Sequence, residues 1–147
     1  MTRAARLGPA ARFFFYGTLL DPDIRVRVLG RALGPDRLEP ASVAGFRRVR
    51  AVGKWYPILV PGLAGDVVDG AVASKLTRGE IAALIAYEGE GYDLVPVTAR
   101  LTASGAAVSA LVFLPAGGLL RPSNQPWELE RWQREDKPRV MRRGSSF

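Results

Sequence analysis

The segment from Phe13 to Leu20, FFFYGTLL, constrains the fold more than any other part of the chain. Consecutive aromatic residues over 13–16 with no polar alternation predict a short buried strand. Gly17 and Thr18 break this strand, and Asp21-Pro22-Asp23 is typical of a helix start. The turn between them exposes backbone N–H groups that no ladder partner needs to satisfy. It therefore suits a carboxylate or an oxyanion, although an ordinary strand-to-helix loop has the same sequence.

The remaining pattern mixes strands and helices. We expect strands over 40–52, 55–61 and 66–76, a hairpin over 94–102 and 107–114, and helices over 21–30, 77–88 and 126–136. Thr77 and Glu80 form a capping box, Gly70 indicates a bulge or a close backbone approach, and Trp127 and Trp132 anchor the last helix. Strands that are mostly adjacent in sequence favour an α+β fold, a small mixed and largely antiparallel β-barrel with flanking helices.

The length of 147 residues predicts a single domain, which we assign to 13–136. Residues 1–12 are basic and lack the apolar segment of a signal peptide, so we interpret them as a flexible N-terminus. Residues 137–147, KPRVMRRGSSF, predict a flexible basic C-terminal tail. No apolar run approaches the roughly 18 residues that a membrane span needs. We therefore expect a cytoplasmic protein with no membrane partner.

The chain contains no cysteine and no histidine. This excludes disulfides, thiol nucleophiles, zinc-finger ligand sets, Ser-His-Asp triads and the usual proton shuttle at neutral pH. Acid–base chemistry near pH 7 would then depend on a carboxylate whose pKa is raised.

The formal net charge of +7 is of the kind that attracts nucleic acid or anionic surfaces. The basic residues gather at the N-terminus, at Arg47-Arg48-Val49-Arg50 and in the tail over 139–143, and they are not interleaved with aromatic residues. We expect a small-molecule substrate rather than nucleic acid as the partner. A basic nucleic-acid binder stays as an alternative, and the pattern does not indicate an oligomeric state.

Glu88 is the one acid in register with the apolar stripe of its helix. Ile81, Leu84 and Ile85 form that stripe, and Glu88 lies seven residues after Ile81. One interpretation is a helix-end residue that turns into solvent before Gly89. The other is a carboxylate at the mouth of a cavity facing the core, where desolvation raises its pKa. Glu90 is a rival whose direction the pattern does not predict.

The chain resembles the gamma-glutamylcyclotransferase-like family, which includes gamma-glutamylamine cyclotransferase and AIG2-like proteins. The resemblance covers roughly residues 13–115. It rests on FFFYGTLL, VLGRAL, VAGFRRVR, YPILVP, DVVDGAVASKLTRGEIAALIAYEGEGY and ALVFL, in that order. It implies a single cyclotransferase-like domain over 13–136 with a cavity at one end of the barrel.

The resemblance also implies an activity. The substrate's α-amino nitrogen would attack its own γ-carbonyl, forming 5-oxoproline and releasing an amine or amino acid, with no cofactor or metal. Glu88 would be the general acid and base. The substrate-binding residues implied are the turn of Tyr16, Gly17, Thr18 and Leu19, with Tyr92 and Tyr56 as further hydrogen-bonding candidates or ordinary strand aromatics.

Two positions depart from the family pattern. Ile85-Ala86 stands where Leu-Asp is frequent, and Leu94 stands where Arg is frequent. The departures are compatible with lost surface pairings, with altered substrate choice, or with a non-catalytic module that binds a small acid on the same fold. Arg47 and Arg48 suit either an acidic leaving group or a solvated strand face. The sequence does not identify the leaving amine.

Overall fold

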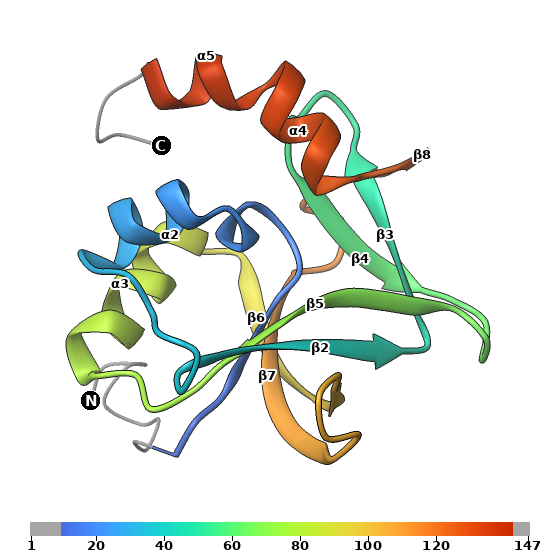
Figure 1. The fold of residues 1–147 in the computed structure, drawn as a ribbon. Coiled ribbons are helices and arrows are strands. Elements are labelled where there is room, and N and C mark those ends of the chain that lie inside the picture. The colour runs from blue at the N-terminus through green and yellow to red at the C-terminus, as the bar shows by residue number, and fades with distance from the viewer. Residues whose placement is uncertain (1–9, 143–147) are drawn as a thin grey trace.

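The fold is a closed five-stranded barrel joined to a three-stranded sheet, with helices at one end (Figure 1). The structure is a computed structural model, and it describes residues 10–142. The strands are β1 (Phe13–Phe15), β2 (Leu38–Ala44), β3 (Phe46–Ala51), β4 (Pro57–Pro61), β5 (Val67–Ala73), β6 (Tyr92–Leu101), β7 (Ala107–Pro115) and β8 (Pro122–Pro126). The helices are η1 (Thr18–Leu20), α2 (Pro22–Leu29), α3 (Arg78–Glu88), α4 (Leu129–Glu135) and α5 (Lys137–Arg142).

The barrel has the strand order β1-β5-β2-β6-β7, and the second sheet has the order β4-β3-β8. All barrel pairings are antiparallel except the one between β1 and β7, which is parallel and closes the barrel. The predicted α+β fold with a mixed, largely antiparallel barrel and flanking helices is therefore confirmed. The predicted hairpin is β6 and β7.

Gly70 allows β1 and β5 to lie against each other. A Cβ atom built there would lie 2.2 Å from the Phe15 carbonyl oxygen and 2.8 Å from the Phe14 ring. The register of β2 with β5 runs through Gly70 without a shift, so the position is a close approach and not a bulge. This close approach seats β1 among the barrel strands, and all three phenylalanine rings are buried. Phe14 packs in one core cluster, whereas Phe13 and Phe15 pack in the cluster that includes residues of α2 and α3.

The single strand predicted over 40–52 is wrong, because two strands occupy this region. Gly45 separates them with a φ of 86°, a left-handed conformation that glycine adopts without strain. β2 stays in the barrel, and β3 leaves it to join the second sheet. The edge strand predicted after Trp55 is confirmed as β4. β8 was not predicted, because its sequence PSNQP has no apolar alternation.

The two helices beside the barrel follow their predicted end signals. The Asp21 carboxylate accepts hydrogen bonds from the N–H groups of Asp23 and Ile24, and α2 ends at Gly30 with a φ of 85°. α3 begins with the capping box of Thr77 and Glu80.

None of the helices within residues 10–142 combines the length and apolar character that a membrane span needs.

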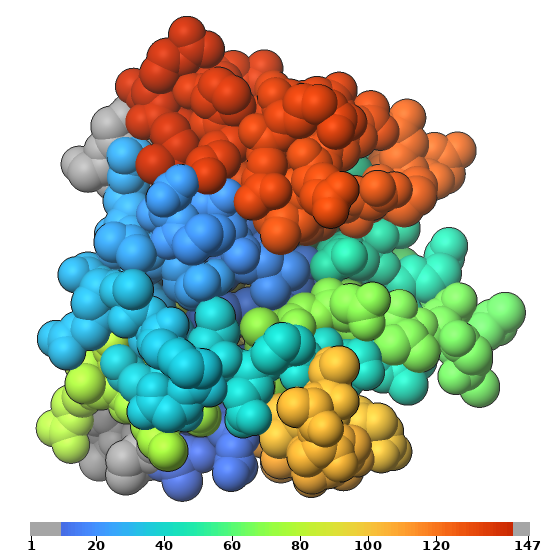
Figure 2. Space-filling view, viewed as in Figure 1, coloured from blue at the N-terminus to red at the C-terminus, as the bar shows by residue number. Residues whose placement is uncertain are grey.

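The C-terminal segment packs on the domain. α4 is the helix predicted over 126–136, and both of its tryptophan anchors are buried. Figure 2 shows the residues of this segment as a continuous layer against those of α2. The predicted flexible tail is wrong for 137–142, where α5 buries Val140 and Lys137 pairs with Asp21 at 2.8 Å. Residues 1–9 of the predicted N-terminus and 143–147 of the predicted tail lie outside the described residues.

Candidate active site

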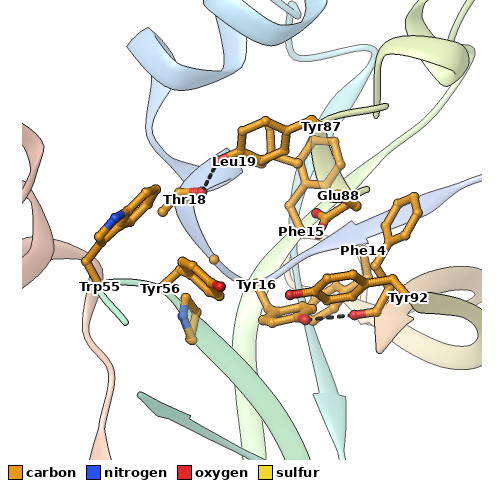
Figure 3. A pocket seen from close by; sticks show the side chains of 13 residues that line it. Phe14, Phe15, Tyr16, Thr18, Leu19, Trp55, Tyr56, Tyr87, Glu88 and Tyr92 are labelled. Atoms are coloured by element: carbon orange, nitrogen blue, oxygen red, sulfur yellow. Dashed lines mark hydrogen bonds between the residues drawn. The ribbon is translucent and has the colours of Figure 1, made fainter. Parts of the chain in front are cut away.

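A cavity of about 320 Å³ opens beside the end of β1 (Figure 3). Its walls come from four parts of the chain: β1 with the turn after it, the segment leading into β4, the end of α3 with the start of β6, and β7. The lining residues are Phe14, Phe15, Tyr16, Gly17, Thr18, Leu19, Trp55, Tyr56, Pro57, Tyr87, Glu88, Tyr92 and Phe113. Every site residue expected from the sequence is among them.

Glu88 is the last residue of α3, and its side chain lies between those of Tyr87 and Tyr92 in Figure 3. Ile81 and Leu84 bury the same side of the helix in the core, which turns the side chain of Glu88 toward the cavity. Burial raises the pKa of the Glu88 carboxyl to about 7. Of the two interpretations of Glu88, its position in the cavity wall agrees with the carboxylate that faces a cavity and not with a residue turned into solvent. Its carboxylate can exchange protons near neutral pH.

Glu90 and the two departures from the family pattern lie elsewhere. Glu90 and Ala86 are exposed, and Leu94 packs against the core cluster beneath α3. None of these residues lines the cavity. The substitutions at Ala86 and Leu94 therefore leave the cavity wall unchanged.

The turn after β1 presents main-chain donors. Its hydrogen bonds run from the Leu20 N–H to the Gly17 carbonyl at 2.9 Å and from the Asp21 N–H to the Thr18 carbonyl at 3.0 Å. Within residues 10–142, the N–H groups of Thr18 and Leu19 make no such backbone bond. Because these residues line the cavity, the turn can supply donors to an anionic group.

Tyr16 lines the cavity, and its side chain also connects two strands of the barrel. Its hydroxyl donates to the Phe113 carbonyl at 2.7 Å, which ties the end of β1 to β7. Burial raises the pKa of Tyr16 well above its ordinary value, so the phenol stays neutral. With this hydroxyl already bonded inside the protein, the neighbouring main chain is the part of the turn that can meet a ligand.

Tyr56 and Tyr92 lie on opposite walls, and their hydroxyl groups face each other in Figure 3. Both side chains are partly buried. Burial raises the pKa of each phenol, and the nearby Glu88 carboxylate raises it further. Both tyrosines therefore remain neutral hydrogen-bonding groups at physiological pH.

Tyr87 and Trp55 also line the cavity, although the sequence pattern did not lead us to expect them there. Tyr87 follows Leu84 by three residues, so the helical period could have placed it on the cavity side. Its hydroxyl lies 2.6 Å from that of Thr18. Trp55 carries no comparable signal, because its place in the wall depends on contacts with a distant segment.

The charge of the cavity wall comes from one acid. Among the lining residues Glu88 is the only carboxylate, and no lysine or arginine is present. Arg47 and Arg48 do not line the cavity, so neither would touch an acidic leaving group held there. Arg48 is not on a solvated face either, because it bonds to the carbonyl oxygens of Tyr16 and Asp69.

A sequence model of the gamma-glutamyl cyclotransferase, AIG2-like family matches residues 13–134. The chain belongs to this family. It is 29% identical over 124 residues to AIG2-like protein C of Arabidopsis thaliana, covering 84% of this chain and 70% of the plant protein. The range 13–134 that the family model matches contains every residue that lines the cavity.

Solved structures share the fold of this chain. The solution structure of an Arabidopsis thaliana protein superposes with a TM-score of 0.66 at 25% identity, covering 97% of this chain and 92% of that one. A gamma-glutamyl cyclotransferase superposes with a TM-score of 0.59 at 15% identity, covering 92% and 99% of the two chains. At that identity the second match shows the shared fold alone.

Proposed function

We propose that this protein converts a gamma-glutamyl amine or gamma-glutamyl amino acid into 5-oxoproline and releases the amine. Glu88 is the general acid and base. The observation that carries the proposal is a carboxylate with a pKa of about 7 in a cavity whose rim includes the main-chain donors of the turn after β1. A general base at neutral pH needs a pKa in this range, and the chain has no histidine to supply one.

The cavity wall suits the two charged groups of a glutamyl end. The N–H groups of Thr18 and Leu19 are donors for its α-carboxylate. The Glu88 carboxylate is an acceptor for its α-ammonium. Tyr56 and Tyr92 are neutral hydroxyls on the two walls and can hold the polar atoms of the γ-amide. Contacts at both ends would fold the substrate so that its nitrogen approaches its own γ-carbonyl.

The reaction then proceeds by acyl transfer between two nitrogens of one molecule. Glu88 takes a proton from the α-ammonium, and the freed amine attacks the γ-carbonyl carbon. A new C–N bond closes the five-membered ring. Glu88 returns the proton to the leaving nitrogen as the old C–N bond breaks. The ring nitrogen loses its second proton and the amine departs as its ammonium, so atoms and charge balance without another reactant.

The test is an assay of 5-oxoproline release by the purified protein. The panel should include gamma-glutamyl derivatives of alkylamines, of diamines and of α-amino acids, because the leaving group is not fixed by the glutamyl contacts. Turnover of at least one member supports the proposal. Absence of turnover on the whole panel, with 5-oxoproline or glutamate still bound in calorimetry, would favour a non-catalytic module that binds a small acid.

A further inference from the structure

Arg48 lies behind the cavity wall and joins three segments of the chain. Its guanidinium donates to the Tyr16 carbonyl at 3.0 Å and to the Asp69 carbonyl at 2.9 Å. Its Nε donates to the Trp127 carbonyl at 3.2 Å. The end of β1, the β5 strand and the start of the C-terminal segment are therefore held by one side chain. The Tyr16 carbonyl stands at the start of the turn that lines the cavity. The hydrogen bond from Arg48 to this carbonyl therefore helps to fix the position of the turn.

Trp127 continues this connection to the opposite wall. Its ring lies beneath the Arg48 guanidinium, 5.5 Å from Cζ to the ring centroid. Its indole Nε1 donates to the Trp55 carbonyl at 3.1 Å. The Trp55 ring lines the cavity and also lies 6.2 Å from that of Trp132 in α4. The C-terminal segment thus fixes both the main chain and the ring of this wall residue.

We propose that Arg48 and Trp127 are a positioning pair through which the C-terminal segment sets the affinity of the cavity for substrate. The pair holds the Tyr16 turn on one side and Trp55 on the other, and neither member lines the cavity. In its kinetic form the inference rests on the proposed function. The chemistry at Glu88 is not touched by the pair, so its effect falls on binding rather than on the chemical step.

The chemistry of arginine is required at position 48. A planar guanidinium offers several donors in a fixed fork and also stacks on an aromatic ring. Lysine carries the same charge but ends in one compact ammonium, which cannot hold three carbonyl groups in this arrangement. The Arg48→Lys variant therefore separates the geometry of the contacts from the charge alone.

The experiment compares four variants in steady-state kinetics on the best substrate of the panel. Arg48→Met, Arg48→Lys and Trp127→Phe are each expected to raise KM by about 5- to 10-fold, the worth of one or two hydrogen bonds. Their kcat and the pH midpoint of kcat/KM should stay at the wild-type values. Arg47→Met is the matched control, because Arg47 is the exposed neighbour in β3, and its KM should not change.

Two results would overturn the inference. One is a KM in all three variants equal to that of Arg47→Met. The other is a lowered kcat at unchanged KM, which indicates only a smaller folded fraction. Trp127→Phe keeps a ring for Arg48 and loses the indole N–H, so it answers the question even where Arg48→Met does not fold.

The result for the wild-type protein distinguishes failure of the proposed reaction from failure of the positioning role. If wild type turns over no member of the panel, the proposed reaction fails, and the pair is then tested by calorimetric affinity for 5-oxoproline. A 5- to 10-fold weaker Kd in the pair variants alone supports the positioning role. Equal Kd values in all proteins overturn it. If wild type neither turns over nor binds, both proposals are overturned.

Discussion

The hydroxyl of Tyr87 lies 2.6 Å from the hydroxyl of Thr18. This bond joins the last turn of α3 to the turn after β1. Tyr87 directly precedes Glu88, so the bond fixes the position of the acid relative to the main-chain donors on the other side of the cavity. Burial raises the pKa of Tyr87 to about 12, which keeps its hydroxyl protonated at physiological pH.

The first prediction concerns a variant that lacks the hydrogen bond between Tyr87 and Thr18. Tyr87→Phe should lower kcat/KM by about 5- to 10-fold, because the acid and the turn lose a shared constraint. The free energy of unfolding should fall by about 1 kcal/mol, the usual net value of one hydrogen bond. Steady-state kinetics on the best substrate of the panel measure the change in kcat/KM. Urea unfolding measures the change in the free energy of unfolding. An unchanged kcat/KM would show that the bond does not position the acid.

The second prediction concerns the pH dependence of catalysis. In the proposed reaction the carboxylate form of Glu88 takes the proton, so kcat/KM should rise with pH along a one-proton limb centred near pH 7. The measurement is a pH profile of kcat/KM at constant ionic strength. A limb centred near 4.5, the ordinary pKa of a glutamate, would mean that burial does not raise the pKa of Glu88 in the free protein.

The third prediction concerns stability. Glu88 has a pKa of about 7 in the folded protein against an ordinary 4.5, so the folded state binds the proton more tightly. This contribution is fully present below pH 4.5 and is lost as pH rises through 7. Glu88→Gln cannot ionise, so at pH 8 it should be more stable than wild type by up to about 3 kcal/mol. At pH 4 the two proteins should unfold at nearly the same denaturant concentration.

The fourth prediction concerns the close approach of β5 to β1. Gly70→Ala places a methyl group against the Phe15 carbonyl oxygen, where an added Cβ has only 2.2 Å of space. The free energy of unfolding should fall by about 3 kcal/mol or more. Gly65→Ala is the control, because nothing lies within 4 Å of a Cβ there. Equal urea midpoints for the two variants would contradict this role of Gly70.

The sequence predicted those parts of the site that depend on local periodicity. The stripe of Ile81 and Leu84 placed Glu88 on the core side, and the helix caps marked where α2 and α3 begin and end. The buried aromatic strand followed by Gly17-Thr18 located the turn. These signals lie within one element each, so they could be interpreted without knowing what the element packs against.

The sequence did not predict contacts between distant segments. Trp55 lies in the cavity wall because Trp127, 72 residues later, donates to its carbonyl. The helix at 137–142 forms on the surface of α2, where Lys137 meets the buried carboxylate of Asp21. Its sequence KPRVMR shows too short an apolar pattern to indicate a helix. The division of 40–52 at Gly45 likewise depended on which sheet each half joins.

Substitution of the acid gives the most direct test. The comparison is 5-oxoproline release at pH 8 by wild type, Glu88→Gln and Glu90→Gln, with 5-oxoproline affinity measured for each. Glu90 is the control because it is exposed, close in sequence and absent from the cavity wall. We expect Glu88→Gln to lose about a hundredfold or more in kcat with its affinity retained, and Glu90→Gln to match wild type. Wild-type turnover in Glu88→Gln would contradict the assignment of Glu88 as the acid and base.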